Sequence, residues 1–176
     1  MKTLISITAA SRVFLEVMGT NAMRVSLATL ALSGLLAVPA SAGEQVIEFR
    51  YVIHPLEVKT FEAPKIEGQT MVMGKVFGVV AFKDGRVGTK DFIYQAELLN
   101  GDGPIHGFST YRFEDGSSIT ASFAGEIKGG QRHGDYAILS GTGLYANATG
   151  TGTFESLPSK LEGATILNTT LNVKTP

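Results

Sequence analysis

Alternation of apolar and polar residues, interrupted by glycine-containing turns, is the feature of this chain that most constrains its fold. Turn residues such as Asp84-Gly85, Asn100–Pro104, Glu114–Gly116 and Gly129-Gly130 separate the short alternating segments. The segments predicted as strands are Gln45–Ile53, Thr70–Lys83, Thr89–Leu99, Ile105–Phe113, Ser117–Ile127, Asp135–Leu139, Thr153–Leu157 and Thr165–Val173. This spacing is typical of an antiparallel sandwich or barrel. Because closure removes exposed sheet edges, we expect an all-β, eight-stranded antiparallel β-barrel, whose interior can hold one small ligand.

The segment Met23–Ala42 has the composition of a secretory signal peptide. Arg24 precedes an apolar stretch, and Ala40-Ser41-Ala42 forms a small-x-small cleavage box. A transmembrane anchor is the alternative, but the stretch is short, carries hydroxyl groups and lacks a charged stop-transfer segment. We therefore predict a secreted or periplasmic protein whose mature chain begins near Gly43 and has no integral membrane segment.

Residues 1–22 stand in front of this predicted signal. Met23 begins a complete signal peptide by itself, so either translation starts there or residues 1–22 lengthen the positively charged start. The domain organisation we expect is an N-terminal extension plus signal peptide over residues 1–42 and a barrel domain over residues 43–176.

Composition excludes several classes of site. The chain has no cysteine, which rules out disulfides, a thiol nucleophile and a cysteine-ligated metal. A formal net charge of −1 without a basic run argues against a nucleic-acid partner. His54, His106 and His133 lie far apart and show no metal-ligand spacing, so we predict no metal site.

The segment Gly141–Ala146 matches the short dinucleotide-binding fingerprint G-x-G-x-x-G/A. That fingerprint requires a helix opening directly on the glycines. Here Asn147–Gly152 follows, rich in glycine and threonine, and it would not sustain a helix. We interpret Gly141, Gly143, Gly150 and Gly152 as structural residues that permit bulges and close strand approach.

Three tyrosines fall on the more apolar faces of their predicted strands. Tyr51 shares a face with Phe49, Tyr94 with Lys90 and Phe92, and Tyr111 with Gly107, Ser109 and Phe113. An interior lined by aromatic rings with few polar groups is typical of a pocket for an apolar small molecule, and equally of a filled barrel core. The predicted ligand-binding residues are Phe49, Tyr51, Tyr94, Tyr111 and Phe113, with Glu48 and His54 as weaker polar candidates.

The run from Tyr111 to Glu155 resembles the allene oxide cyclase and dirigent superfamily of calycin-like barrels. The resemblance rests on an x-D-G hairpin followed by a G-T-G-x-[YF]-x-x-A-x-G segment. The residues that carry it are Phe113, Asp115, Gly116, Gly141, Thr142, Gly143, Tyr145, Ala148 and Gly150. It implies an eight-stranded calycin-like barrel, often trimeric, with a hydrophobic cavity and no metal or organic cofactor. The Glu/Asn pair of the plant cyclases is not reproduced in Glu48–His54, so no catalytic residue is assigned.

The leading functional hypothesis is an exported barrel that binds a hydrophobic small molecule. It includes a cofactor-free cyclase or isomerase of allene oxide cyclase type, in which the cavity holds a flexible substrate and a phenol or carboxylate polarises one oxygen. The alternatives are a non-catalytic dirigent-like auxiliary or carrier of a lipophilic ligand, and a cell-envelope protein whose barrel is filled.

Overall fold

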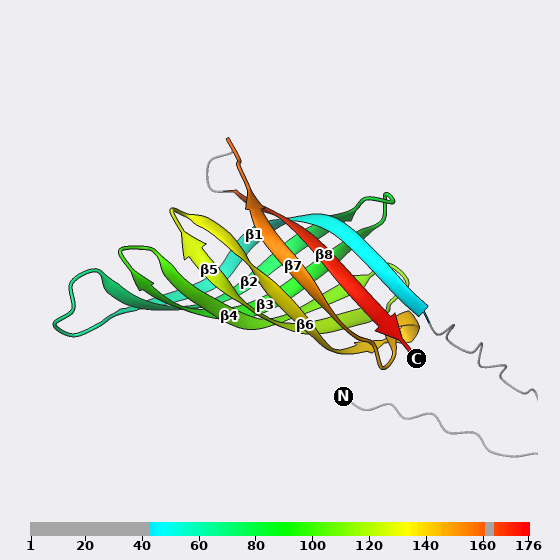
Figure 1. Cartoon of the computed structure of the whole chain (residues 1–176). Helices are drawn as coiled ribbons and strands as arrows, with labels where there is room; N and C mark the ends of the chain where they lie inside the picture. Colours follow the sequence, from blue (N-terminus) through cyan, green and yellow to red (C-terminus); the bar gives the residue numbers. More distant parts are fainter. Residues whose placement is uncertain (1–42, 161–163) are drawn as a thin grey trace, which may run out of the picture. The chain divides into compact units, whose positions relative to one another are not determined.

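Each strand of the chain pairs in antiparallel fashion with the next, and β1 closes the sheet by pairing with β8 (Figure 1). The computed structural model describes residues 43–160 and 164–176. Over these residues the strands are β1 (Gly43–Glu62), β2 (Gln69–Phe82), β3 (Val87–Leu99), β4 (Gly103–Phe113), β5 (Ser118–Lys128), β6 (Gln131–Thr142), β7 (Thr149–Leu157) and β8 (Thr165–Thr175), with a short 3₁₀ helix at Gly143–Tyr145. The predicted all-β, eight-stranded antiparallel barrel is confirmed.

Three strands are markedly longer than their sequence pattern indicated. β1 continues past Ile53 to Glu62, β6 begins at Gln131, inside a segment that reads as a polar loop, and β7 begins at Thr149 instead of Thr153. The second part of β1 is exposed on both faces, so it shows no inward-outward alternation. Pro55 lies at a register shift in its pairing with β2, which also interrupts the pattern.

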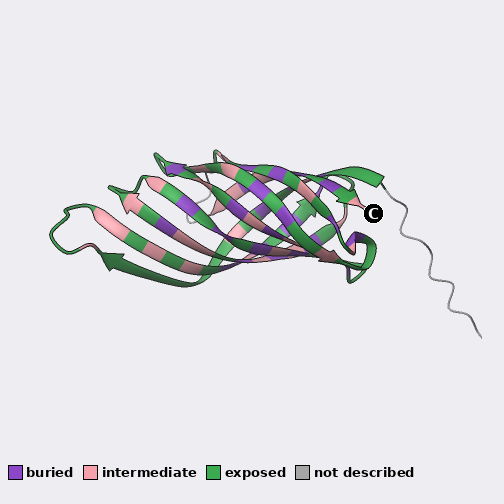
Figure 2. Ribbon diagram, turned by 60° about the horizontal axis from the view of Figure 1, so that its bottom comes forward, coloured by how far each residue is buried: buried purple, intermediate pink, exposed green. Residues whose placement is uncertain are grey.

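Alternation along the strands separates the barrel interior from its outer surface (Figure 2). On β4, Gly107, Ser109, Tyr111 and Phe113 are buried. The alternating residues His106 and Phe108 face outward and are exposed. β3 follows the same rule, with Lys90, Phe92 and Ala96 buried on one face. The predicted inward faces are confirmed on both strands.

One end of the barrel is filled by packed aromatic rings. Phe82 at the end of β2 stacks on Phe113 at the end of β4, with ring centroids 5.3 Å apart. Phe113 in turn contacts Tyr145 of the 3₁₀ helix at 4.7 Å, and Phe49 meets Phe82 edge-on at 5.3 Å. We call this the packed half: Ile47, Phe49, Val80, Phe82, Tyr111, Phe113, Ile119, Tyr145, Leu171 and Val173, all buried.

The glycine-rich segment Gly141–Gly152 comprises the end of β6, the connection over residues 143–148 and the start of the antiparallel strand β7. A three-residue 3₁₀ helix stands where a dinucleotide-binding fold would open a long helix. Gly143 adopts φ +60°, and Gly150 adopts φ +142° with the position of a Cβ only 2.0 Å from the carbonyl oxygen of Asn172. These two glycines are structural, as predicted, because no side chain fits there without strain.

The predicted signal peptide and the segment before it lie outside the described residues. Of the helices in the described part of the chain, none is long and apolar enough to cross a membrane.

Candidate ligand-binding cavity

A cavity of about 280 Å³ occupies the barrel interior beyond the packed half. It lies toward the end of the barrel that carries the turns at residues 63–68, 100–102 and 129–130. Its walls are mainly aliphatic and aromatic, and they come from all eight strands: Tyr51, Ile53, Pro55, Val72, Val76, Lys90, Phe92, Tyr94, Ala96, Leu98, Ile105, Phe123, Ile127, Arg132, Tyr136, Phe154, Thr165 and Leu167. We call this region the cavity half. Its size is near the lower limit of typical small-molecule pockets, which begin at about 300 Å³.

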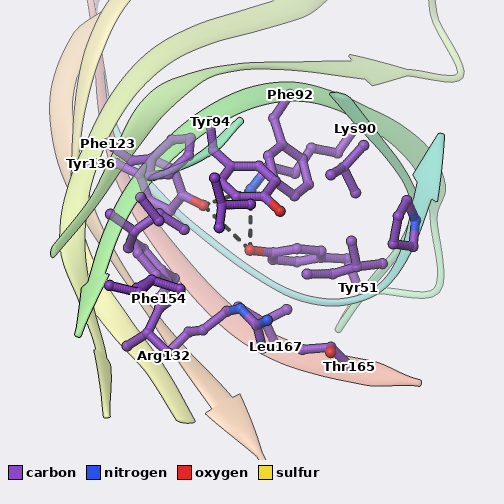
Figure 3. Close-up of a pocket in the computed structure, with 18 residues that line it drawn as sticks. Tyr51, Lys90, Phe92, Tyr94, Phe123, Arg132, Tyr136, Phe154, Thr165 and Leu167 are labelled. Carbon is purple, nitrogen blue, oxygen red and sulfur yellow. Dashed lines mark hydrogen bonds between the residues drawn. The ribbon is translucent and has the colours of Figure 1, made fainter. Parts of the chain in front are cut away.

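Lys90 contributes a primary amine to this apolar space. The residue lies on β3, two positions before Phe92, so the alternation of the strand turns its side chain into the barrel. Only 1% of Lys90 is exposed. Its Nζ donates hydrogen bonds to the hydroxyl oxygens of Tyr136 at 2.6 Å and Tyr51 at 3.1 Å (Figure 3). The amine is therefore held at one point between β1 and β6.

Aromatic rings surround the amine. Its Nζ lies 4.2 Å from the ring centroid of Tyr51, 4.8 Å from that of Phe92 and 4.9 Å from that of Tyr136. Tyr111 and Phe123 follow at 5.0 and 5.8 Å. Within the described chain, none of the side chains that line the cavity is acidic. Burial without a carboxylate partner lowers the pKa of Lys90 well below its ordinary value of 10.5.

The phenols around Lys90 are held in their protonated form. Burial raises the pKa of Tyr51, Tyr111 and Tyr136 well above the ordinary value of 10.0. The hydroxyl groups of Tyr51 and Tyr136 lie 3.4 Å apart, and with Nζ of Lys90 they form a hydrogen-bonded triangle (Figure 3). We call Tyr51, Lys90 and Tyr136 the polar triad. It offers a ligand hydrogen-bond donors and an amine in otherwise apolar surroundings.

Arg132 is the second basic side chain in the cavity wall. It belongs to β6, and its backbone N–H donates to Oγ of Ser156 at 2.9 Å. Its guanidinium donates a long hydrogen bond of 3.5 Å to the carbonyl oxygen of Gly130, in the turn that precedes β6. Arg132 therefore lies at the end of the cavity near the turn at residues 129–130. Burial raises the pKa of Tyr94, and the charge of Arg132 opposes this increase.

The structure divides the five predicted ligand-binding residues between the two halves. Tyr51 and Tyr94 line the cavity. Phe49, Tyr111 and Phe113 lie in the packed half, where Phe49 contacts Tyr111 edge-on at 5.1 Å. Ligand binding by any of the five stays a prediction.

The weaker polar candidates face away from the interior. Glu48 forms an ion pair with Lys83 at 2.6 Å on the outer surface. His54 is exposed on β1, opposite Phe77 of β2. Neither lines the cavity, so the assignment of Glu48 and His54 to the site was wrong. Both side chains lie on β1 at positions that face the outer surface of the barrel.

Sequence reasoning missed Lys90, Arg132 and Tyr136 as site residues. Lys90 carried a usable signal, because it is a charged residue on the same face as Phe92, Tyr94 and Ala96. Tyr136 carried one as well, because it lies in the predicted strand Asp135–Leu139 and alternates onto the same face as Ile138. Arg132 carried none, because it precedes that predicted strand in a segment that reads as a polar loop.

Comparison with known proteins defines the class of fold. No protein-family model matches the sequence, and neither does any curated protein. Solved structures do match. The pterocarpan synthase dirigent protein GePTS1 superposes with a TM-score of 0.53 at 16% identity, covering 84% of this chain and 98% of that one. The pterocarpan synthase dirigent protein PsPTS1 gives the same TM-score and identity, covering 75% of this chain and 95% of the other. The fold is that of a dirigent-like β-barrel.

Proposed function

We propose that this chain is a dirigent-like barrel that binds an apolar small molecule in its cavity, without a metal or organic cofactor. The observation that carries the proposal is the cavity itself, a mainly aliphatic and aromatic chamber with few polar side chains, which are chiefly the polar triad and Arg132. Apolar walls provide affinity through burial, and a few placed polar atoms fix orientation. The dirigent neighbours share the fold, and binding a small molecule in such a barrel agrees with their names.

Binding of a fluorescent apolar probe tests the proposal. N-phenyl-1-naphthylamine should gain fluorescence on binding, and it should quench tyrosine emission, because the chain contains no tryptophan. Ala96 is fully buried in the cavity wall, so Ala96→Leu should reduce binding by filling space.

Ala81→Leu is the matched control, because Ala81 is exposed on the outer surface of β2. It should bind the probe like the parent chain. Equal binding by both variants, each with a native circular dichroism spectrum, would place the probe outside the barrel and overturn the proposal.

A cofactor-free cyclase or isomerase is the second candidate, and the polar triad is the observation that favours it. Two protonated phenols in a desolvated site are suited to donate hydrogen bonds to an oxygen that gains charge during ring closure. The test is the conversion of an apolar vinyl epoxide, followed by chiral chromatography. Tyr136→Phe should lower the rate on the order of a hundredfold and change the affinity far less. Racemic product formed at the rate of the buffer reaction excludes this candidate.

We also propose export to the periplasm or the exterior, supported by the cleavage box Ala40-Ser41-Ala42. Amino-terminal sequencing of protein recovered from its host should begin near Gly43. A chain that keeps Met1 or Met23 would contradict export by this route.

Assembly into a trimer, implied by the family resemblance, is a proposal of the same kind. Phe61, Ile93 and Phe108 are each more than half exposed on the outer surface of the barrel, at 55%, 56% and 54%. Burial of such side chains favours association. Sedimentation equilibrium measures the mass directly, and a monomer at all concentrations would contradict the trimer.

A further inference from the structure

The amine of Lys90 is chemically distinct from every other polar group in the cavity wall. It is a primary amine with a single flexible stem, fixed by two phenol oxygens. The groups facing it are Tyr51 from β1, Phe92 from its own strand, Tyr111 from β4, Phe123 from β5 and Tyr136 from β6. None of these carries a negative charge that would hold the amine as an ammonium ion.

The surroundings therefore favour the neutral, nucleophilic form of the amine. An ordinary lysine has a pKa of about 10.4 and is almost wholly protonated at pH 7. Desolvation lowers the pKa of Lys90 well below that value. A lysine desolvated in an apolar pocket is a nucleophile suited to carbonyl carbon.

We propose that Lys90 binds an apolar aldehyde or ketone covalently, as an imine in the cavity. This inference rests on the proposed binding of an apolar molecule and names its chemical class. The carbonyl carbon reaches Nζ next to the hydroxyl groups of the polar triad, while the hydrocarbon body lies against walls such as Val72, Ala96 and Leu98.

The reaction balances with the groups present. The lone pair of Nζ attacks the carbonyl carbon, and a proton moves from nitrogen to the carbonyl oxygen to give a carbinolamine. A phenol of the polar triad then donates a proton to the hydroxyl group of the carbinolamine, which leaves as water while the C=N bond forms. The remaining proton on nitrogen returns to that phenolate, which restores the phenol. One water is released, and no oxidant or reductant is required.

The phenols assist by position. The hydroxyl of Tyr136 lies 2.6 Å from Nζ, so an oxygen attached to the carbon that Nζ attacks falls within reach of a protonated phenol. Tyr51, at 3.1 Å, occupies a second side of the amine. Both hydroxyls stay protonated at neutral pH because burial raises the pKa of each phenol. They are therefore available to donate to the departing oxygen.

Reductive trapping tests the inference on the whole chain. Decanal is the probe, and sodium cyanoborohydride at pH 7 reduces any imine to a stable secondary amine. Mass spectrometry should show one decyl group per chain, and peptide mapping should place it on Lys90. Lys174 is the internal reference, because its hydrogen bond to Glu44 raises its pKa and keeps it protonated. Lys90 should react at least about tenfold faster, since each unit of pKa changes the neutral fraction tenfold.

Two variants complete the design. Lys90→Met keeps the length and apolar body of the side chain and should abolish the single modification. Lys83→Met removes an exposed lysine on the outer surface and should leave the modification unchanged. If Lys90→Met fails to fold, peptide mapping on the parent chain still decides the question. Modification spread over exposed lysines, with Lys90 unmodified, overturns the inference.

Decan-1-ol separates this inference from the proposed function. It has the same chain length as decanal but forms no imine. Displacement of N-phenyl-1-naphthylamine by decan-1-ol, without trapping of decanal on Lys90, would leave an apolar binding cavity and refute the imine. If neither decanal nor decan-1-ol displaces the probe and decanal does not modify Lys90, the imine and the proposed binding of an apolar molecule are both refuted.

Discussion

The packed half and the cavity half of the barrel are built by the same eight strands, yet one is filled with side chains and the other is hollow. In the packed half, stacked and edge-on rings such as Phe82, Phe113 and Tyr145 fill the section of the barrel. In the cavity half, smaller inward residues such as Val72, Ala96 and Thr165 leave about 280 Å³ open. The difference teaches that inward-facing alternation builds the barrel, while side-chain volume at each level decides whether that level is solid or hollow.

Lys90 marks the boundary between the halves. Its Nζ contacts the ring of Tyr111, which belongs to the packed half, and the ring of Tyr136, which lines the cavity. The packed half thus supplies a dry, rigid floor on which a desolvated amine is held. A barrel filled at both ends would have no cavity for a ligand. In a barrel that is hollow at both ends, water would reach the amine of Lys90.

The largest expected effect comes from truncating one leucine in each half of β8. Leu171 is fully buried in the packed half, and Leu167 is 2% exposed in the cavity wall. Leu171→Ala should lower the free energy of unfolding by about 2–5 kcal/mol, because it opens a new void in tight packing. Leu167→Ala enlarges an existing cavity and should fall at or below the lower end of that range. Urea denaturation measures both, and equal losses would break the distinction between the halves.

Replacing Lys90 tests the boundary. Lys90→Met should raise the free energy of unfolding at pH 7, because a desolvated amine is exchanged for an apolar side chain of similar length. The parent chain should itself gain stability as pH rises from the depressed pKa of Lys90 toward 10.5, since the unfolded state binds more protons in that window.

The advantage of Lys90→Met should therefore shrink as pH increases across the same window. Above pH 10 both proteins should lose stability, because the unfolded chain deprotonates tyrosines whose pKa is raised in the folded state. Thermal melts from about pH 6 to about pH 11, a range that includes the ordinary pKa values of lysine and tyrosine, measure both trends. If the difference in stability between the two proteins stays constant with pH, burial does not lower the pKa of Lys90.

Two glycines with nearly the same positive φ angle allow the two ends of the barrel to be compared. Gly143, at φ +60°, lies beside the packed half, where an added Cβ would stand 2.9 Å from Cβ of Ser117. Gly129, at φ +55°, lies in the turn at the cavity end with nothing within 4 Å. Substitution by alanine should destabilise both by about 1–2 kcal/mol through the left-handed backbone alone. Gly143→Ala should lower the melting temperature further because of its contact, and an identical shift in both variants would show that this end is not tightly packed.

The smallest effects come from removing single phenol hydroxyl groups. Tyr136→Phe deletes an acceptor of the hydrogen bond from Lys90 and should lower stability by about 0.5–1.5 kcal/mol. Tyr111→Phe should leave stability unchanged or raise it, because the buried hydroxyl of Tyr111 has no hydrogen-bond partner among the described residues. Chemical denaturation of the pair measures the difference. A larger loss for Tyr111→Phe would place its hydroxyl in the polar network after all.

Sequence alone determined that eight strands form and which faces of β1, β3 and β4 point inward. Period-two alternation predicts all eight strands, and it is sufficient to place Tyr51, Tyr94, Tyr111 and Lys90 on the inward faces. The ends of the strands are poorly defined where alternation fails, as in the doubly exposed second part of β1. Glu48 and His54 are polar and lie close in sequence to Tyr51, but they occupy outward positions of β1 and do not line the cavity.

Only the tertiary structure decided which inward residues meet. Alternation states whether a side chain points in or out, but it does not state the level along the barrel axis, which depends on the stagger between all paired strands. The closed register places Lys90 of β3 between Tyr51 of β1 and Tyr136 of β6, residues 39 and 46 positions away in the chain. The same stagger sends Phe49 and Phe113 to the packed half and leaves Tyr94 in the cavity wall. The candidate site is thus a product of sheet closure, because no local pattern in the sequence records the height at which each strand passes its neighbours.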